Sequence, residues 1–413
     1  MKRIDLKEVL TGFTADEMSG NTNRQTRVEP VEIAGHRILK YVNEFWTSKQ
    51  RQANRLHEVP YRACFKAQLP RFFIELFTEP QDVVYDPFSG RGTTVLEAAL
   101  LGRNIVSNDC NPLSEILFSP RLFIPDRAAL EVRLLAIPVR EEHRANLDLS
   151  MFYHPQTESE IVSLRAYLNE RRANNMEDEL DRWIRMVATN RLTGHSSGFF
   201  SVYTLPPNQA VSQERQRKIN EKRKQRPEYR DTRKLILKKT GSLTKEITDP
   251  TSRQLRRIGS KACFLTRDAR CTPEIQSNSV QLTVTSPPFL NVVQYPQDNW
   301  LRCWFNGIDP DEVASKITAS GKIADWCEVM GAVFDELFRI TRPGGTVAFE
   351  VGEVRGGRVK LEEYVVPLGL KAGFDCEGIM INHQNFTKTA NIWGISNNTK
   401  GTNTNRIVIF RKD

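Results

Sequence analysis

Val284-Thr285-Ser286-Pro287-Pro288-Phe289 is the stretch that decides how this chain can be interpreted. It overlaps a run of mostly apolar residues, 280–284, which predicts a buried strand. Each proline lacks an amide N–H and has a fixed φ, so the strand ends there and the chain continues as a stiff, extended turn. This turn carries a hydroxyl group, free carbonyl groups and an aromatic ring. Together these groups can hold a flat base that bears an amino group.

A second motif lies about two hundred residues earlier and predicts a nucleotide-binding βαβ unit. A short apolar strand, 82–86, leads into the turn Pro87-Phe88-Ser89-Gly90-Arg91-Gly92-Thr93-Thr94 and then into a segment with helical spacing, 95–101. The next strand, 104–108, ends at Asp109, 17 residues after Gly92. A carboxylate at that point can accept hydrogen bonds from two ribose hydroxyls. The turn lacks the Gly-Lys-Ser/Thr ending of a phosphate-binding P-loop.

The two motifs together resemble those of amino-DNA methyltransferases. The glycine turn is similar to their S-adenosylmethionine loop, and Ser-Pro-Pro-Phe is similar to their catalytic motif in its cytosine-N4 version. The resemblance implies an α/β fold, a doubly wound Rossmann-like methyltransferase sheet with a largely helical inserted target-recognition region, and S-adenosylmethionine as cofactor. The residues that it implies for cofactor binding are Phe65, Lys66, Asp86, Pro87, Phe88, Ser89, Gly90, Gly92, Thr93, Asp109, Asp268 and Ser286.

The resemblance also implies a catalytic set without a covalent nucleophile: Ser286, Pro287, Pro288 and Phe289. The Ser286 hydroxyl and the Pro287 carbonyl would accept hydrogen bonds from the exocyclic amine, so that positioning and electrostatics supply much of the catalysis. The Phe289 ring would stack on a base flipped out of the duplex. Adenine-N6 enzymes usually carry Asp or Asn at the position of Ser286, so the serine favours cytosine N4. A cytosine-C5 enzyme is disfavoured because its cysteine nucleophile typically follows a proline, and the chain contains no Pro-Cys pair.

The organisation predicted along the chain has four parts. Residues 1–45 form an N-terminal extension, and residues 46–126, helical as far as residue 80, form the cofactor-binding half of the methyltransferase domain. Residues 127–258 form the helical insert, and residues 259–413 form the catalytic half. Parallel strands place their carboxyl ends at one edge of a sheet, so the glycine turn and the Pro-Pro turn should meet there.

Positive charge is concentrated in the predicted insert. The chain has a formal net charge of +9, and residues 211–240 hold twelve basic and four acidic side chains, a net +8. A basic segment on a nearly neutral body suggests a phosphate backbone as partner, and the alternative is a solvated charged linker. The residues predicted to contact DNA are Arg215, Arg217, Lys218, Lys222, Arg223, Lys224 and Arg226.

The composition argues against several classes of protein. No apolar run approaches the roughly 20 residues of a membrane span, and the first residues lack the apolar core of a signal peptide. The seven cysteines are scattered without a C-x-x-C pair, which argues against disulfides and a metal site and favours a cytoplasmic protein. The expected partners are double-stranded DNA and a restriction or defence nuclease. An adenine-N6 enzyme, an RNA base methyltransferase and a catalytically silent DNA-binding subunit are the alternatives.

Overall fold

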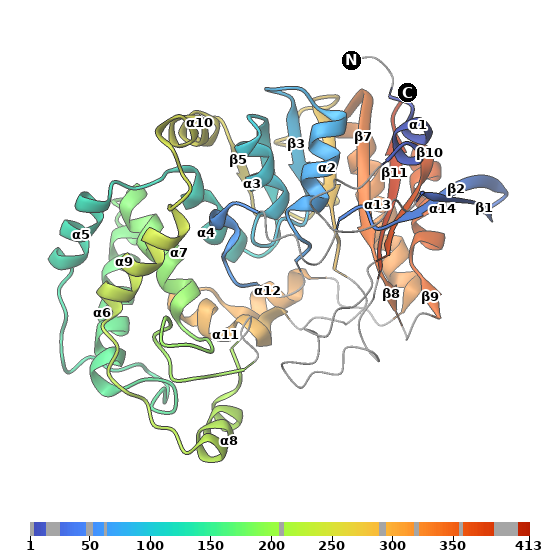
Figure 1. Cartoon of the computed structure of the whole chain (residues 1–413). Helices are drawn as coiled ribbons and strands as arrows, with labels where there is room; N and C mark the ends of the chain where they lie inside the picture. Colours follow the sequence, from blue (N-terminus) through green and yellow to red (C-terminus); the bar gives the residue numbers. More distant parts are fainter. Residues whose placement is uncertain are drawn as a thin grey trace.

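A nine-stranded sheet forms the centre of the computed structural model (Figure 1). The structure describes residues 4–13, 25–46, 53–61, 64–205, 210–288, 295–317, 322–354, 358–383 and 404–413. The strand order is β1-β2-β10-β11-β7-β6-β3-β4-β5. A separate two-stranded sheet pairs β8 (Glu353–Val354) with β9 (Val359–Lys360).

Five neighbouring strands are parallel and carry the two sequence motifs. They are β5 (Cys263–Leu265), β4 (Asn104–Asn108), β3 (Val83–Asp86), β6 (Val280–Thr285) and β7 (Thr341–Val351). The strand order reverses between β3 and β6, because β4 and β5 lie on one side of β3 while β7 lies beyond β6. Ligands of doubly wound sheets bind outside the carboxyl ends of the strands at such a switch point. The predicted doubly wound α/β fold is confirmed.

The remaining strands extend the sheet beyond β7. Antiparallel pairs join β11 (Thr404–Arg411) to β7 and to β10 (Asp375–His383). The hairpin of β1 (Arg27–Ile33) and β2 (His36–Asn43) follows, and β2 pairs with β10 in parallel.

The N-terminal residues therefore do not form a separate extension, and the predicted boundary at residue 45 is wrong for this hairpin. A two-residue turn with positive φ at Ala34 and Gly35 closes it, which matches the right-handed twist of paired strands. The hairpin is at the edge of the sheet, and its side chains are only partly buried, so its hydrophobic alternation is weak in the sequence.

Helices cover both faces of the sheet and bury two hydrophobic clusters. On one face lie α2 (Gln68–Phe77) and α3 (Thr93–Leu100), and their side chains share a cluster with the sheet residues Val84 and Leu282. On the other face α13 (Ile323–Ile340) and α14 (Glu362–Ala372) pack over the side chains of β7, β10 and β11. Within residues 46–80 the described helical segments are only α2 and the short η2 (Arg55–His57), fewer than predicted.

Residues 127–258 are helical, as their sequence predicts. They form α5 (Arg127–Ala136), α6 (Pro155–Ala173), α7 (Glu179–Arg191), α8 (Gln213–Arg223), α9 (Thr232–Leu243) and α10 (Asp249–Gly259). The centre of this insert is α7, whose Trp183 is completely buried. The helices α11 (Tyr295–Asn306) and α12 (Pro310–Lys316) follow the Pro-Pro turn, and α11 packs against α6 and α7. The insert and the catalytic half thus share one core.

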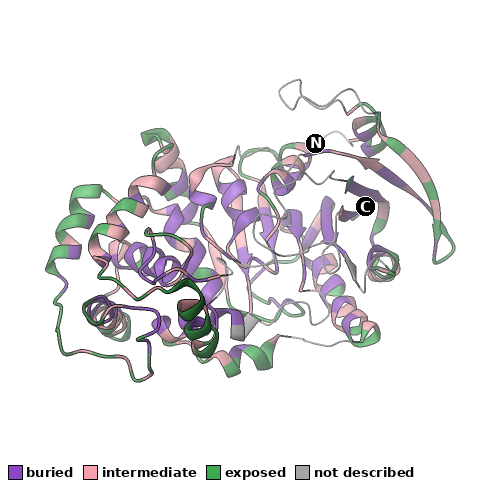
Figure 2. Ribbon diagram, turned by 60° about the horizontal axis from the view of Figure 1, so that its bottom comes forward, coloured by how far each residue is buried: buried purple, intermediate pink, exposed green. Residues whose placement is uncertain are grey.

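Three short elements complete the described chain. They are α1 (Leu6–Thr11), α4 (Leu113–Phe118) and η3 (Ser119–Leu122). Figure 2 shows that buried residues gather on the sheet and on the inner sides of its helices, whereas α8 and the β1–β2 hairpin are largely exposed or half-buried. None of the described helices is both long and apolar enough to cross a lipid bilayer.

Candidate active site

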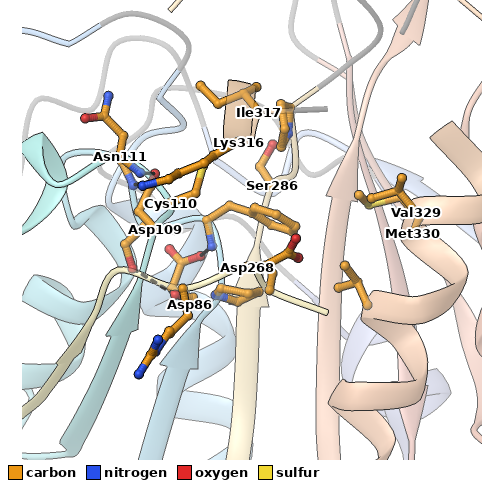
Figure 3. A pocket seen from close by; sticks show the side chains of 18 of the residues that line it. Asp86, Asp109, Cys110, Asn111, Asp268, Ser286, Lys316, Ile317, Val329 and Met330 are labelled. Carbon is orange, nitrogen blue, oxygen red and sulfur yellow. Dashed lines mark hydrogen bonds between the residues drawn. The ribbon is translucent and has the colours of Figure 1, made fainter. Parts of the chain in front are cut away.

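A pocket opens at the carboxyl edge of the sheet, where β3, β4 and β6 end (Figure 3). It encloses about 1050 Å³, including the space that is open to solvent. The residues from the two sequence motifs and their surroundings that line it are Phe65, Asp86, Pro87, Phe88, Ser89, Gly90, Thr93, Asp109, Asp268, Ser286 and Pro288. The strand order thus brings together segments that lie two hundred residues apart in the chain.

The glycine turn at the start of α3 is shaped by two glycines with positive φ, 51° at Gly90 and 76° at Gly92. The Gly90 N–H donates to Asp109 Oδ2 at 2.8 Å, which ties the turn to the end of β4. A Cβ atom on Gly92 would lie 2.6 Å from the Phe118 ring, so only glycine fits there. Gly92 does not line the pocket, and its observed role is to let the turn pack on α4.

Two buried carboxylates line the pocket, and burial raises the pKa of both. The pKa of Asp86 rises to about 7 because the side chain is desolvated, although the Thr285 hydroxyl donates to its Oδ1 at 2.6 Å and partly opposes the shift. The pKa of Asp109 rises to about 6 for the same reason, partly opposed by hydrogen bonds from the backbone N–H groups of Asn111 and Gly90. Hydrogen-bond donors on a bound ligand would stabilise the ionised form of each carboxylate.

Asp268 lies at the pocket on the turn after β5, but Arg270 already occupies its carboxylate. The Arg270 side chain donates to both carboxylate oxygens, at 2.5 to 3.0 Å, and this interaction lowers the pKa of Asp268. A ligand amino group would therefore have to share Asp268 with Arg270. The turn is held in place by Asn108, whose side chain bonds the backbone N–H and C=O of Arg267.

The catalytic turn predicted from the sequence is fastened to three neighbouring elements. The Thr94 hydroxyl of α3 donates to the Val284 carbonyl at 3.0 Å, and Trp326 Nε1 of α13 donates to the Pro288 carbonyl at 3.0 Å. The bond from Thr285 to Asp86 on β3 is the third contact. Ser286 lines the pocket, Pro287 is buried and does not line it, and Phe289 lies outside the described residues.

Several residues that line the pocket were not identified from the sequence: Tyr61, Cys64, Cys110, Asn111, Arg267, Ala269, Lys316, Ile317, Trp326, Val329, Met330 and Val333. Four of them come from α13 and form an apolar wall. Their helical spacing was visible, but only the packing of α13 over the sheet turns that face toward the pocket. Lys66, which was predicted to bind the cofactor, is exposed and does not line the pocket.

The seven basic residues predicted to contact DNA are all exposed and lie on α8 or just after it. The helix lies at the lower end of the insert in Figure 1, on the side of the molecule where the parallel strands end. Gln216 is its only buried residue, and Arg217 pairs with Asp148 at 2.7 Å. The guanidinium of Arg223 lies over the Tyr203 ring, 3.7 Å from its centre.

The described part of the chain contains no metal-binding cluster and no disulfide bond. No cluster of three or more His, Cys, Asp or Glu side chains among the described residues could hold a metal ion. All seven cysteines are free thiols.

Comparison with known proteins points to the same chemistry as the motifs. A family profile described as DNA methylase, of the N6/N4 type, matches residues 16–115. The type II methyltransferase M.BsoBI of Geobacillus stearothermophilus is 27% identical over 317 residues, which are 69% of this chain and 58% of M.BsoBI. The chain therefore spans little more than half the length of this relative. Both matches support the resemblance to the amino-DNA methyltransferase family, whose cofactor is S-adenosylmethionine.

Solved structures that resemble the chain include a candidate DNA modification methylase of Thermus thermophilus, which is 25% identical. The matched part is 35% of this chain and 50% of the Thermus chain, and the TM-score is 0.21. An S-adenosylmethionine-dependent methyltransferase of Methanosarcina mazei is 10% identical, covers 82% and 96% of the two chains, and has a TM-score of 0.32. These scores are low, and the fold assignment rests on the strand order and strand directions described above.

Gly92→Ala should destabilise the protein by roughly 2 to 4 kcal/mol, since a Cβ atom there meets Phe118 in addition to the strain of a positive φ. Gly35→Ala is the matched control, because Gly35 has a φ of +80° but nothing within 4 Å of its Cβ position. Its cost should be about 1 kcal/mol. Urea unfolding measures both, and equal losses would contradict the packing role of Gly92.

Cofactor affinity should be constant above about pH 8 and fall as the pH is lowered through 7 and then through 6. The pKa values of Asp86 and Asp109 are raised to about 7 and about 6, and each must lose its proton to accept hydrogen bonds from the cofactor. Calorimetric titration of S-adenosylmethionine between pH 5 and 8.5 measures the effect. The Asp109→Asn variant should bind more weakly and show a shallower pH dependence, and an unchanged profile would be inconsistent with a role for this carboxylate.

Proposed function

We propose that this protein is a DNA methyltransferase that transfers the methyl group of S-adenosylmethionine to the N4 amine of cytosine in a short duplex sequence. The observation that carries the proposal is that Ser286 and the glycine turn line one pocket, with Thr285 bonded directly to Asp86. A methyl donor bound at the glycine turn and an amine held by Ser286 would then lie within the same cavity. Transfer by direct attack requires this proximity and no covalent enzyme intermediate.

The residues of the pocket divide into two groups by their chemistry. Bound S-adenosylmethionine supplies an electrophilic methyl group on a sulfonium sulfur. Asp109 accepts hydrogen bonds from its ribose, and Asp86 with Phe88 borders its methionine part. The Ser286 hydroxyl and the Pro287 carbonyl accept the two N–H bonds of the target amine, which favours a more tetrahedral and nucleophilic nitrogen.

The choice of base within the proposal rests on one residue. Ser286 occupies the position at which adenine-N6 enzymes usually carry a carboxylate or an amide, and it favours cytosine. Adenine N6 is the second candidate, because the matched family includes both activities. The test is to methylate duplex DNA with the purified protein, digest it to nucleosides and identify the product. N4-methylcytosine supports the proposal, and N6-methyladenine overturns the choice of base.

The partner in the proposal is duplex DNA, bound between the insert and the carboxyl edge of the sheet. The exposed basic residues of α8 supply phosphate contacts, and base flipping would bring cytosine to Ser286. M.BsoBI is named as a type II methyltransferase, and by that likeness the protein would act beside a restriction or defence nuclease. Competition between duplex DNA and RNA for binding tests the choice of nucleic acid.

Ser286→Ala should reduce the rate of methyl transfer by about 10² to 10³-fold, because the target amine loses one of its acceptors. The affinities for S-adenosylmethionine and DNA should change less than about twofold, since Ser286 contributes little binding energy in the ground state. Ser260→Ala removes an exposed hydroxyl at the end of α10 and serves as the control. Equal losses in rate and in DNA affinity would contradict the role in activating the base.

Neutralising Arg223, Lys224 and Arg226 to glutamine should flatten the dependence of DNA affinity on salt, by about 0.9 in logarithmic slope for each phosphate that the variant no longer neutralises. The control replaces Lys7, Arg37 and Lys371, which are equally exposed but lie on α1, β2 and α14. Fluorescence anisotropy at several salt concentrations measures both slopes. An unchanged slope in the α8 variant would indicate that these residues do not contact DNA.

A further inference from the structure

A buried glutamate lies directly beside the catalytic serine. Glu350 is on β7, and the pairing of β6 with β7 places Val284 opposite Ala348 and Thr285 opposite Phe349. Continuing this register by one residue brings Ser286 next to Glu350, on the same face of the sheet as Val284 and Ala348. Only 7% of Glu350 is exposed, and it does not line the cofactor pocket.

Two polar groups hold the Glu350 side chain. Asn405 Nδ2 on β11 donates to Glu350 Oε1 at 2.9 Å, and the Ser286 hydroxyl donates to the same carboxylate. Burial raises the pKa of Glu350, and these two hydrogen bonds partly oppose that shift. The carboxylate is thus shared between a fixed amide and the hydroxyl that faces the target base.

Charged groups on the neighbouring strands are engaged elsewhere. Arg406 follows Asn405 on β11, but successive side chains of a strand point to opposite faces of the sheet. Arg406 forms an ion pair with Glu362 of α14, and Lys40 contacts the same glutamate. Asp86 lies on the far side of β6 and accepts from Thr285. Burial, Asn405 and Ser286 are therefore the influences on Glu350 that the described residues supply.

We propose that Glu350 is the positioning residue for Ser286 and the group that takes up, through Ser286, the proton released by methyl transfer. This inference rests on the proposed function, because it concerns the fate of the target amine. It assigns a role to a carboxylate that contacts neither cofactor nor base.

The positioning role follows from the two ways in which a hydroxyl can bond. An amine with two N–H groups needs acceptors, and a hydroxyl that donates to Glu350 turns its lone pairs toward the amine. When Glu350 is protonated it can itself donate, and the Ser286 hydrogen is then free to point at the base. The ionised glutamate therefore sets the hydroxyl in the orientation that catalysis needs.

The proton transfer balances without a further reactant. The lone pair of the amine forms the new N–C bond while the S–C bond breaks, and its electron pair stays on sulfur. The methylated nitrogen is left with a positive charge and one proton too many. That proton passes to Ser286 Oγ as the proton of Ser286 passes to Glu350. The serine hydroxyl is restored, and the buried carboxylate becomes neutral, which its surroundings favour.

The experiment measures the rate of methyl transfer in a single turnover, with S-adenosylmethionine and duplex DNA both saturating, from pH 5 to 9. Glu350→Gln should lower the rate by about 10²-fold or more and remove the acidic limb of the profile that the wild type shows. The affinities for both substrates should be unchanged. Saturation with the cofactor separates this limb from the titration of Asp86 and Asp109.

Two further variants test the route through the serine. If Glu350 acts only through Ser286, the double variant Ser286→Ala with Glu350→Gln should be no slower than Ser286→Ala alone. Asn405→Ala keeps both groups but removes one hydrogen bond to the carboxylate, so the acidic limb should move to higher pH. This variant keeps the test decisive if Glu350→Gln does not fold.

The inference is overturned if Glu350→Gln reacts at the wild-type rate. It is also overturned if the acidic limb of Asn405→Ala lies at the same pH as that of the wild type. Failure of the proposed function would appear differently, as an absence of N4-methylcytosine from the wild-type reaction itself.

Discussion

The hydrogen bond from the Thr285 hydroxyl to the buried carboxylate of Asp86 is the interaction on which the site depends. It joins the last residue of β6 to the last residue of β3, and so it sets the distance between the catalytic turn and the glycine turn. Asp86 is desolvated, and a hydrogen bond to a buried carboxylate is worth more than one at the surface. The glycine turn, Asp109 and Ser286 are all positioned relative to this pair.

Buried hydroxyl–carboxylate pairs occur on both sides of the catalytic strand. Thr285 bonds to Asp86 on β3, and its neighbour Ser286 bonds to Glu350 on β7. The first pair belongs to the cofactor pocket, whereas the second is hidden behind it. Since parallel strands end at one edge of the sheet, the last residue of β6 and the residue that follows it can reach carboxylates on two different strands. In the proposed reaction, this arrangement would separate the group that borders the methyl donor from the group that orients the target amine.

Packing connects the site to the basic insert. The catalytic turn leads into α11, which lies against α6 and α7, and one hydrophobic cluster runs from the sheet through Trp183 of α7. Trp326 fastens the Pro288 carbonyl from the opposite side. The turn that is proposed to hold the base is therefore fixed between the sheet and the helices that carry α8. A shared, closely packed core of this kind keeps the two parts in a constant relation.

The sequence by itself determined the βαβ unit, the end of β6 at two prolines, the helical insert and the glycines that the turn requires, because these follow from local backbone chemistry. Only the tertiary structure decided that Trp326, Met330 and Glu350 surround the site, since each lies on an element that the fold brings there from more than thirty residues away. It also showed that the Arg270 side chain is bonded to the Asp268 carboxylate and that the N-terminal hairpin extends the sheet. Contacts across a sheet depend on strand order and register, which periodicity along one strand does not contain.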